Sequence, residues 1–221
     1  AVFKQATETD FKIHTLVENL MHLVREYKFD GIELSWLHPR YQDVTQTQYE
    51  KLIHELHKQL KPLGLLLSSS ILCGVNAEGI PMYDAAAQTE NAWNYLDWVS
   101  VAAYDGGDGE KHSPYELMVN ACDYWRDKRG IPAEKIVASI PFYGRPTWCA
   151  YFEILESDPD ADSKDVVVIH GKDVYYNGKE TVRKKAKWVK ENVGGISVWE
   201  LTQDSTDKEK SLFYAMVDAL K

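Results

Sequence analysis

The strongest constraint on the fold is the regular alternation of short apolar segments with longer amphipathic ones along the whole chain. Apolar residues at helical spacing predict helices over 11–27, 47–60, 91–96, 113–129, 180–192 and 208–220. Apolar runs between them predict strands over 31–36, 65–72, 98–104, 135–142 and 195–200, with a small hairpin element at 166–169. Five strands that alternate with helices indicate an α/β fold with a parallel sheet and right-handed crossovers.

Length and charge exclude several classes of protein. The chain has 221 residues, of which 44% are hydrophobic, so we expect one core and a single domain over residues 1–221. It carries 25 basic and 34 acidic residues, and this excess of negative charge argues against nucleic acid and anionic membranes as partners. The chain does not begin with Met, so we expect it to be processed or a piece of a longer protein.

Motifs rich in aromatic and polar residues lie at four strand ends. They are F-D-G-I-E-L-S-W-L at 29–37, V-A-A-Y-D at 101–105, I-P-F-Y-G-R at 140–145 and G-G-I-S-V-W-E-L at 194–201, with Gln203 and Asp204 following. In α/β barrels the site lies at the carboxyl ends of the strands. Aromatic side chains there offer flat apolar faces on which a sugar ring stacks, together with polar groups for its hydroxyls.

Together and in this order, the four motifs resemble glycoside hydrolase family 18, which contains chitinases, endo-N-acetylglucosaminidases and chitinase-like lectins. The resemblance implies a TIM (β/α)8-type barrel, of which this chain supplies about five βα units, the fourth to the eighth. The family's first three strands have no counterpart here, and a complete barrel typically takes about 250 residues. The resemblance also implies a secreted or cell-surface protein whose ligand is an oligosaccharide that contains N-acetylglucosamine.

The residues that carry catalysis in the family are replaced in this sequence. The family hydrolyses by a substrate-assisted route, in which a Glu protonates the glycosidic oxygen and an Asp two residues earlier orients the N-acetyl group. Carried onto this chain, the acid position holds Leu37, the orienting position holds Ser35, and Glu33 replaces a deeper Asp. Leucine has no proton to give, and a general acid is worth about 10²–10⁴-fold in rate. The sequence therefore predicts that family-type hydrolysis is lost.

The sugar-facing residues of the motifs are retained. The resemblance implies that the indole of Trp199 lies under the central sugar, while Tyr104 and Asp105 reach its N-acetyl group. The whole substrate-binding set that it implies is Tyr104, Asp105, Tyr143, Arg145 and Trp199. Trp36 fits a site or a core position equally well. We therefore expect a chitinase-like carbohydrate-binding protein without hydrolytic activity.

Two other functions stay open on the sequence. One is an active glycosidase with relocated catalytic residues, although Glu33 lies about 13 Å along the strand from position 37, at ~3.3 Å per residue. The other is a barrel fragment that acts as a scaffold. Its open edges at 31–36 and 195–200 would pair with another chain or with a preceding segment, because apolar residues would otherwise lack partners. Those apolar residues are Ile32, Leu34, Leu66 and Ile140.

No metal or cofactor is expected. Asp158, Asp160 and Asp162 have the spacing that begins a calcium loop, but Ser163 replaces the required Gly and Ile169 stands in place of the bidentate Glu. Three neighbouring lysines in the segment 180–192 are expected on a solvated helix face, namely Lys184, Lys185 and Lys187.

Overall fold

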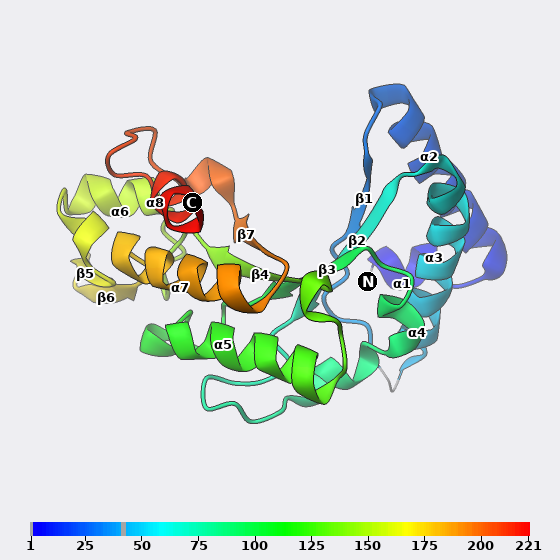
Figure 1. Ribbon diagram of the computed structural model, residues 1–221, viewed down its shortest axis with the longest axis horizontal. Coiled ribbons are helices and arrows are strands. Elements are labelled where there is room, and N and C mark those ends of the chain that lie inside the picture. The colour runs from blue at the N-terminus through cyan, green and yellow to red at the C-terminus, as the bar shows by residue number, and fades with distance from the viewer. Residues whose placement is uncertain (1, 41–42) are drawn as a thin grey trace. The chain divides into compact units, whose positions relative to one another are not determined.

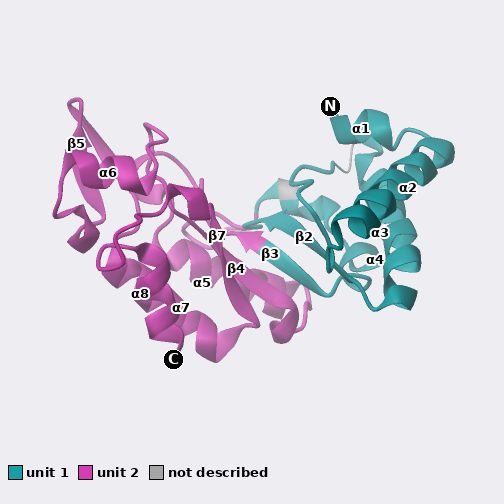
Figure 2. Cartoon of the chain, turned by 90° about the horizontal axis from the view of Figure 1, so that it is seen from above, with its two compact units in different colours: residues 1–74, 82–100 teal, residues 75–81, 101–221 magenta. Residues whose placement is uncertain are grey.

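The computed structural model describes residues 2–40 and 43–221, and Figure 1 shows its helices and strands. The chain divides into two compact units, which are described separately below. Unit one comprises residues 1–74 and 82–100, and unit two comprises residues 75–81 and 101–221 (Figure 2). The expected extent of a single domain, 1–221, stays a prediction.

Five strands form a parallel sheet in the order β1-β2-β3-β4-β7. They are β1 (Gly31–Leu34), β2 (Leu66–Leu72), β3 (Trp98–Ala102), β4 (Ile136–Pro141) and β7 (Gly195–Trp199). The register pairs Gly31 with Leu66 in unit one and Val137 with Gly195 in unit two. The predicted α/β class and all five strands are therefore confirmed. However, β1 and β3 each end two residues earlier than predicted, so the motif residues lie in the loops that follow them.

Unit one covers its strands with helices that have one apolar face. The helices are α1 (Val2–Ala6), α2 (Asp10–Tyr27), α3 (Thr45–Leu60) and α4 (Glu90–Trp93). Thr9 caps α2 by accepting a hydrogen bond from the backbone N–H of Lys12 at 3.2 Å. The buried residues of α2 recur at helical spacing, as predicted: Ile13, Val17, Met21 and Val24. Within the described residues, no helix is long and apolar enough to cross a membrane.

Unit two contains the remaining helices and an antiparallel hairpin. The helices are α5 (Tyr115–Asp123), α6 (Tyr151–Ser157), α7 (Lys179–Asn192) and α8 (Leu212–Leu220), and the hairpin pairs β5 (Val166–Ile169) with β6 (Lys172–Tyr175). Helix α5 continues as a π-helical turn over Tyr124–Lys128. Helix α6 was not predicted. Helix α8 begins four residues later than predicted, because Ser211 caps it by accepting from the backbone N–H of Tyr214.

The sequence-based expectation of uncovered apolar residues was wrong for two of the four. Leu34 is 4% exposed and Ile140 is fully buried. Successive strand residues point to opposite faces, so the exposed Glu33 and the buried Leu34 lie on opposite sides of β1. Leu66 keeps 42% of its surface exposed. The strands β1 and β7 are the ends of the sheet, and their pairing with another chain stays a prediction.

Trp36 belongs to the core of unit one. It is 6% exposed, stacks on Phe3 with ring centroids 4.8 Å apart, and meets the buried ring of Tyr49 edge-on at 5.9 Å. Of the two positions that the sequence allowed, the core position is therefore the correct one.

Replacing Trp36 with Ala should lower the free energy of unfolding by about 3–5 kcal/mol, because it removes two ring contacts and leaves a cavity. Chemical denaturation of the wild type and the variant measures this difference. Phe11→Ala is the matched control, since Phe11 is 78% exposed and its removal should change stability little. An unchanged midpoint for Trp36→Ala would contradict the core assignment.

Candidate functional site

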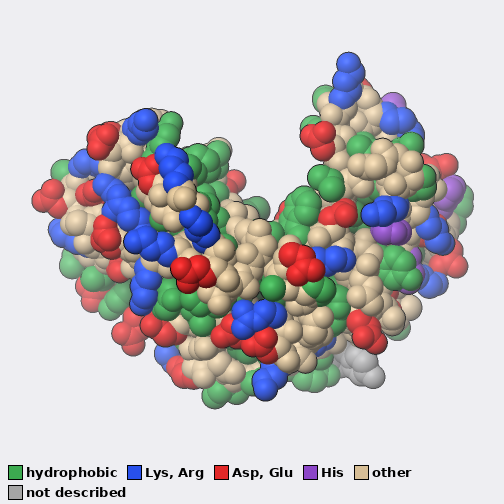
Figure 3. Space-filling model, viewed as in Figure 1, with side chains coloured by type: hydrophobic (Ala, Val, Ile, Leu, Met, Phe, Trp, Pro, Cys, Tyr) green, Lys and Arg blue, Asp and Glu red, His purple; other side chains and the backbone are tan. Residues whose placement is uncertain are grey.

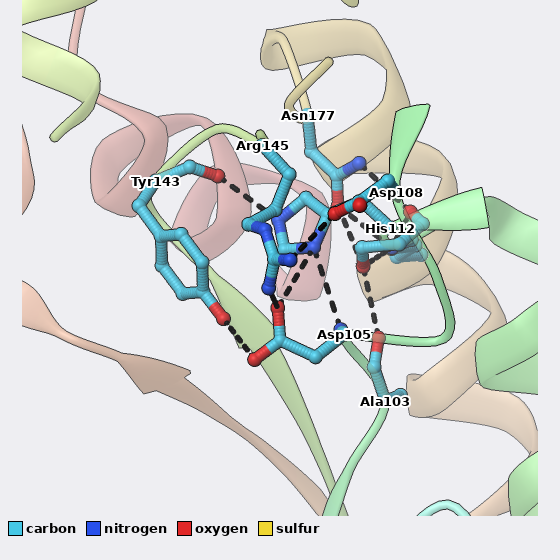
Figure 4. Close-up of polar contacts among 9 residues, drawn as sticks. Ala103, Asp105, Asp108, His112, Tyr143, Arg145 and Asn177 are labelled. Atoms are coloured by element: carbon cyan, nitrogen blue, oxygen red, sulfur yellow. Dashed lines mark hydrogen bonds and ion pairs between the residues drawn. The ribbon is translucent and has the colours of Figure 1, made fainter. Parts of the chain in front are cut away.

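Four of the five predicted binding residues lie together in unit two. Tyr104 and Asp105 follow β3, whereas Tyr143 and Arg145 follow β4, the neighbouring strand of the sheet. The Asp105 carboxylate is the centre of the group. It accepts a hydrogen bond from the Tyr143 hydroxyl at 2.8 Å and one from Arg145 Nη1 at 3.1 Å (Figure 4). The ring of Tyr104 meets the ring of Tyr143 edge-on, with centroids 6.2 Å apart.

A buried histidine joins the two strand ends, and the sequence analysis missed it. His112 is 1% exposed, and its Nδ1 lies 3.4 Å from the backbone nitrogen and 3.3 Å from the carboxylate of Asp105. Its Nε2 lies 3.2 Å from the backbone carbonyl of Tyr143. The Tyr143 carbonyl can only accept, so Nε2 carries a proton and donates to it, an assignment inferred from this partner. Nδ1 accepts from the Asp105 N–H in the neutral ring and donates to the Asp105 carboxylate in the protonated ring. The imidazole thus fixes the spacing between Asp105 and Tyr143.

The surroundings of Asp105 favour its ionised form. Partial burial opposes ionisation, but hydrogen bonds from His112 and Tyr143 and the charges of His112 and Arg145 outweigh it, so the pKa of Asp105 lies below its ordinary value. Burial and the hydrogen bond to Asp105 raise the pKa of Tyr143, so its phenol remains a donor at neutral pH. The Arg145 guanidinium also donates from Nη2 to Asp108 at 2.5 Å. The cluster therefore presents a fixed carboxylate, a phenol and a guanidinium side by side.

Trp148 adds a further aromatic ring that the sequence analysis did not single out. Its indole stacks on Tyr143 with centroids 5.5 Å apart and planes 17° apart. The Arg145 guanidinium carbon lies 3.9 Å from the centre of the same indole. The signal in the sequence is its place three residues after Arg145, in the loop that follows β4.

The loop that carries Asp105 and His112 is held by a buried lysine on α7. Lys185 is fully buried, and its Nζ donates to Ser113 O at 2.8 Å, to Ser113 Oγ at 2.8 Å and to Asn177 Oδ1 at 2.6 Å. Ser113 in turn donates to Ala103 O at 2.9 Å. Lys185 therefore joins both ends of the segment 103–113 to α7.

The predicted solvated position of Lys185 is therefore wrong. Lys184 and Lys187 are exposed as predicted, and Figure 3 shows basic side chains over α7 on the face in view. Adjacent helix positions differ by about 100° around the axis, which turns Lys185 inward between two outward-facing lysines. Lys184 lies against the Tyr115 ring, with its Nζ 3.7 Å from the ring centre.

Gly106 lets this loop close. Its backbone N–H donates to His112 O at 3.1 Å, and a Cβ at this position would lie 2.7 Å from Lys111 O. Such a contact is too short for any side chain, so the close approach requires glycine here.

Trp199, the fifth predicted binding residue, is the last residue of β7. Its carbonyl accepts from the Phe142 N–H at 2.8 Å, directly before Tyr143 in the chain, and 52% of its surface is exposed. Hydrogen bonds and a ring contact join the other four predicted residues to one another. Among the described residues, Trp199 is connected to this group through its backbone carbonyl, not through its indole. Its role in binding stays a prediction.

The positions matched to the family's catalytic residues lie in unit one, and positions 35 and 37 carry no carboxyl group. Ser35 is exposed and Leu37 is half-buried. The Glu33 carboxylate accepts hydrogen bonds from Ser68 at 3.0 Å and from Ser70 at 2.7 Å on β2. Glu33 is therefore anchored to its neighbouring strand.

The acidic residues considered as a calcium loop are paired with lysines. Asp158 lies 2.6 Å from Lys164 Nζ, and Asp162 lies 3.1 Å from Lys179 Nζ. No group of three potential metal ligands occurs among residues 2–40 and 43–221.

Replacing Lys185 with Met should lower the free energy of unfolding by at least about 1–3 kcal/mol, because buried oxygens of Ser113 and Asn177 lose their donor. Lys187→Met on the same helix is the matched control and should fall within about 0.5 kcal/mol of the wild type. Urea unfolding measures both. Equal stability of the two variants would contradict the supporting role of Lys185.

The lowered pKa of Asp105 should give a pH-dependent contribution to stability. A depressed carboxyl pKa stabilises the folded state above the ordinary pKa of 3.8 and loses this effect as pH falls below it. The stability difference between wild type and Asp105→Asn should therefore be largest above about pH 4 and shrink under more acidic conditions. Denaturation at a series of pH values measures it, and a difference that grows on acidification would contradict the assignment.

Two curated relatives share part of the sequence. The chain is 30% identical over 144 residues to probable chitinase 2 of Drosophila melanogaster, covering 58% of this chain and 28% of that protein. It is 25% identical over 245 residues to human chitinase-3-like protein 2, covering 85% of this chain and 62% of the relative. The chain thus spans less than two thirds of either relative.

The fold matches solved structures of TIM-barrel proteins. YKL-39, crystallised in the presence of chitooligosaccharides, superposes with a TM-score of 0.80 at 19% identity, covering 99% of this chain and 75% of that one. The five parallel strands are therefore part of a barrel of this type. The model of glycosyl hydrolases family 18 matches residues 1–204, which include all four strand-end motifs. The chain belongs to glycosyl hydrolases family 18.

Proposed function

We propose that this protein binds oligosaccharides that contain N-acetylglucosamine and does not hydrolyse them. The observation that carries the proposal is the combination of an ordered Asp105–Tyr143–Arg145 cluster with leucine at the position of the family's acid. The chain keeps groups that recognise a sugar and lacks the group that would cleave it.

The cluster suits a neutral sugar that carries an amide. The Asp105 carboxylate accepts from an amide N–H or a hydroxyl, and the Arg145 guanidinium donates to hydroxyl or carbonyl oxygens. His112 and Lys185 fix the loop that carries Asp105, so little conformational freedom is lost when a ligand binds. The half-exposed indole of Trp199 offers an apolar face for a sugar ring.

Hydrolysis lacks a proton donor at the expected place. Leu37 cannot protonate a leaving oxygen, and the hydroxyl of Ser35 carries no charge with which to orient and stabilise an N-acetyl group. Glu33 is the nearest carboxylate on the same strand segment, but Ser68 and Ser70 hold it beside β2. These features favour binding over an active enzyme with relocated residues.

The comparisons support a chitooligosaccharide as the ligand class. The superposed structure of YKL-39 was solved in the presence of chitooligosaccharides of N-acetylglucosamine. The relatives comprise a probable chitinase and a chitinase-like protein, and both names refer to chitin. The chain spans only part of these proteins, so the proposal takes from them the class of ligand and not their complete activity.

Calorimetric titration with a chitin tetrasaccharide should give saturable binding to the wild type. Trp199→Ala should weaken this binding about tenfold or more, the equivalent of about 1.4 kcal/mol of lost stacking, without lowering the melting temperature. Phe11→Ala, which removes an exposed ring in unit one, is the control and should bind as the wild type does. Absence of binding to the wild type would refute the proposed function, and equal affinity of Trp199→Ala would refute the role of that residue.

Turnover of a fluorogenic chitobioside should be undetectable with the wild type, because positions 35 and 37 lack carboxyl groups. The double variant Ser35→Asp with Leu37→Glu should gain activity, since it restores both family groups. The purified proteins are compared by fluorescence release, with Glu33→Gln as the control. Robust turnover by the wild type would refute the non-hydrolytic proposal, and its loss in Glu33→Gln would identify Glu33 as a relocated acid.

A further inference from the structure

Trp148 is held outward by a short, closed loop. The Gly144 N–H donates to Cys149 O at 2.8 Å, which closes the loop at its base, and the Arg145 N–H donates to Tyr175 O at 2.9 Å. Trp148 has a φ of 61°, in the left-handed region that bulky residues rarely occupy. Such a conformation persists only where the surrounding structure fixes it, and it often marks a functional position.

The side chain of Trp148 is fixed as firmly as its backbone. The indole stacks on Tyr143, and the Arg145 guanidinium lies over it at 3.9 Å. Both of these residues donate to the carboxylate of Asp105, so the indole lies directly beside the proposed sugar site. Even so, 58% of the surface of Trp148 stays exposed, so much of this residue is open to solvent.

Polar groups accompany this exposed ring. Asp108, whose side chain is 70% exposed, lies 2.5 Å from Nη2 of Arg145, the residue whose guanidinium lies over the indole. A pyranose presents an apolar C–H face and a rim of hydroxyl groups. The indole matches the face, while the carboxylate of Asp108 and the N–H groups of Arg145 match the rim.

We propose that Trp148 forms a second sugar subsite, which stacks the unit next to the one held at the Asp105–Tyr143–Arg145 cluster. This inference rests on the proposed function and names the extent of the ligand, a chitooligosaccharide of more than one unit. Because the indole is already rigid, stacking on it loses little side-chain entropy. Affinity therefore rises with the number of sugar units, and Trp148 supplies part of this increase.

The test is calorimetric titration of the purified chain with N-acetylglucosamine oligomers of increasing length, beginning with the monosaccharide. The wild type is compared with Trp148→Ala, Trp148→Phe and the control Phe11→Ala. We expect Trp148→Ala to bind the monosaccharide nearly as the wild type does but to lose about tenfold or more in affinity for longer oligomers. Trp148→Phe should recover part of this loss, because it keeps an aromatic face.

Fluorescence provides a second measurement that does not depend on the alanine variant. The chain has 7 tryptophans, and the change in emission caused by a long oligomer should be smaller in Trp148→Phe than in the wild type at saturation. The monosaccharide should give no such difference. An identical change in both proteins would overturn the subsite, even if Trp148→Ala fails to fold.

Two other outcomes separate this inference from the proposed function. If Trp148→Ala binds every oligomer as the wild type does, or loses affinity equally at every length, the second subsite is wrong. In the latter case Trp148 only positions Tyr143 and Arg145. If the wild type binds no oligomer at all, the proposed function fails and the subsite fails with it.

Discussion

The candidate site depends on one carboxylate. Asp105 receives the phenol of Tyr143 and the guanidinium of Arg145, and the ring of His112 lies against both its carboxylate and its backbone. These contacts join the end of β3 to the end of β4, so the spacing of two strand ends is set by a single ionised group. Removal of that charge would leave a buried imidazole and a buried phenol with weaker partners, and the two loops would lose their common anchor.

Support for this carboxylate comes from a second buried charge on a different element. Lys185 donates to Ser113 and Asn177 from the inward side of α7, and Ser113 lies directly after His112. Burial of an ammonium group is expensive unless all its protons find acceptors. Here three neutral oxygens receive them, so the cost of burial is offset by hydrogen bonds that also order the site loop. Helix α7 thereby takes part in shaping the site.

The two strand-end regions differ in the groups that they carry. In unit two the polar and aromatic groups form a connected cluster, extended by the outward-facing indole of Trp148. In unit one the positions that perform catalysis in the family hold a serine and a leucine, while the remaining Glu33 is bound to two serines of β2. Under the proposed function, the recognition residues follow β3 and β4, whereas the positions matched to the family's catalytic residues follow β1.

The sequence by itself determined the α/β class, four of the residues that cluster around Asp105 and the absence of a carboxyl at position 37, and the family resemblance added the order of the five strands. These properties follow from local periodicity and from motifs within single segments, which do not require knowledge of distant contacts. Only the tertiary structure decided that Trp36 is core, that Lys185 is buried and that His112 and Trp148 join the cluster. The contacts of Trp36, His112 and Lys185 join segments that are far apart in sequence, whereas Trp148 reaches the cluster through the conformation of its own loop. Lys185 is buried between two exposed lysines because acceptors from distant segments surround it, and no local pattern records them.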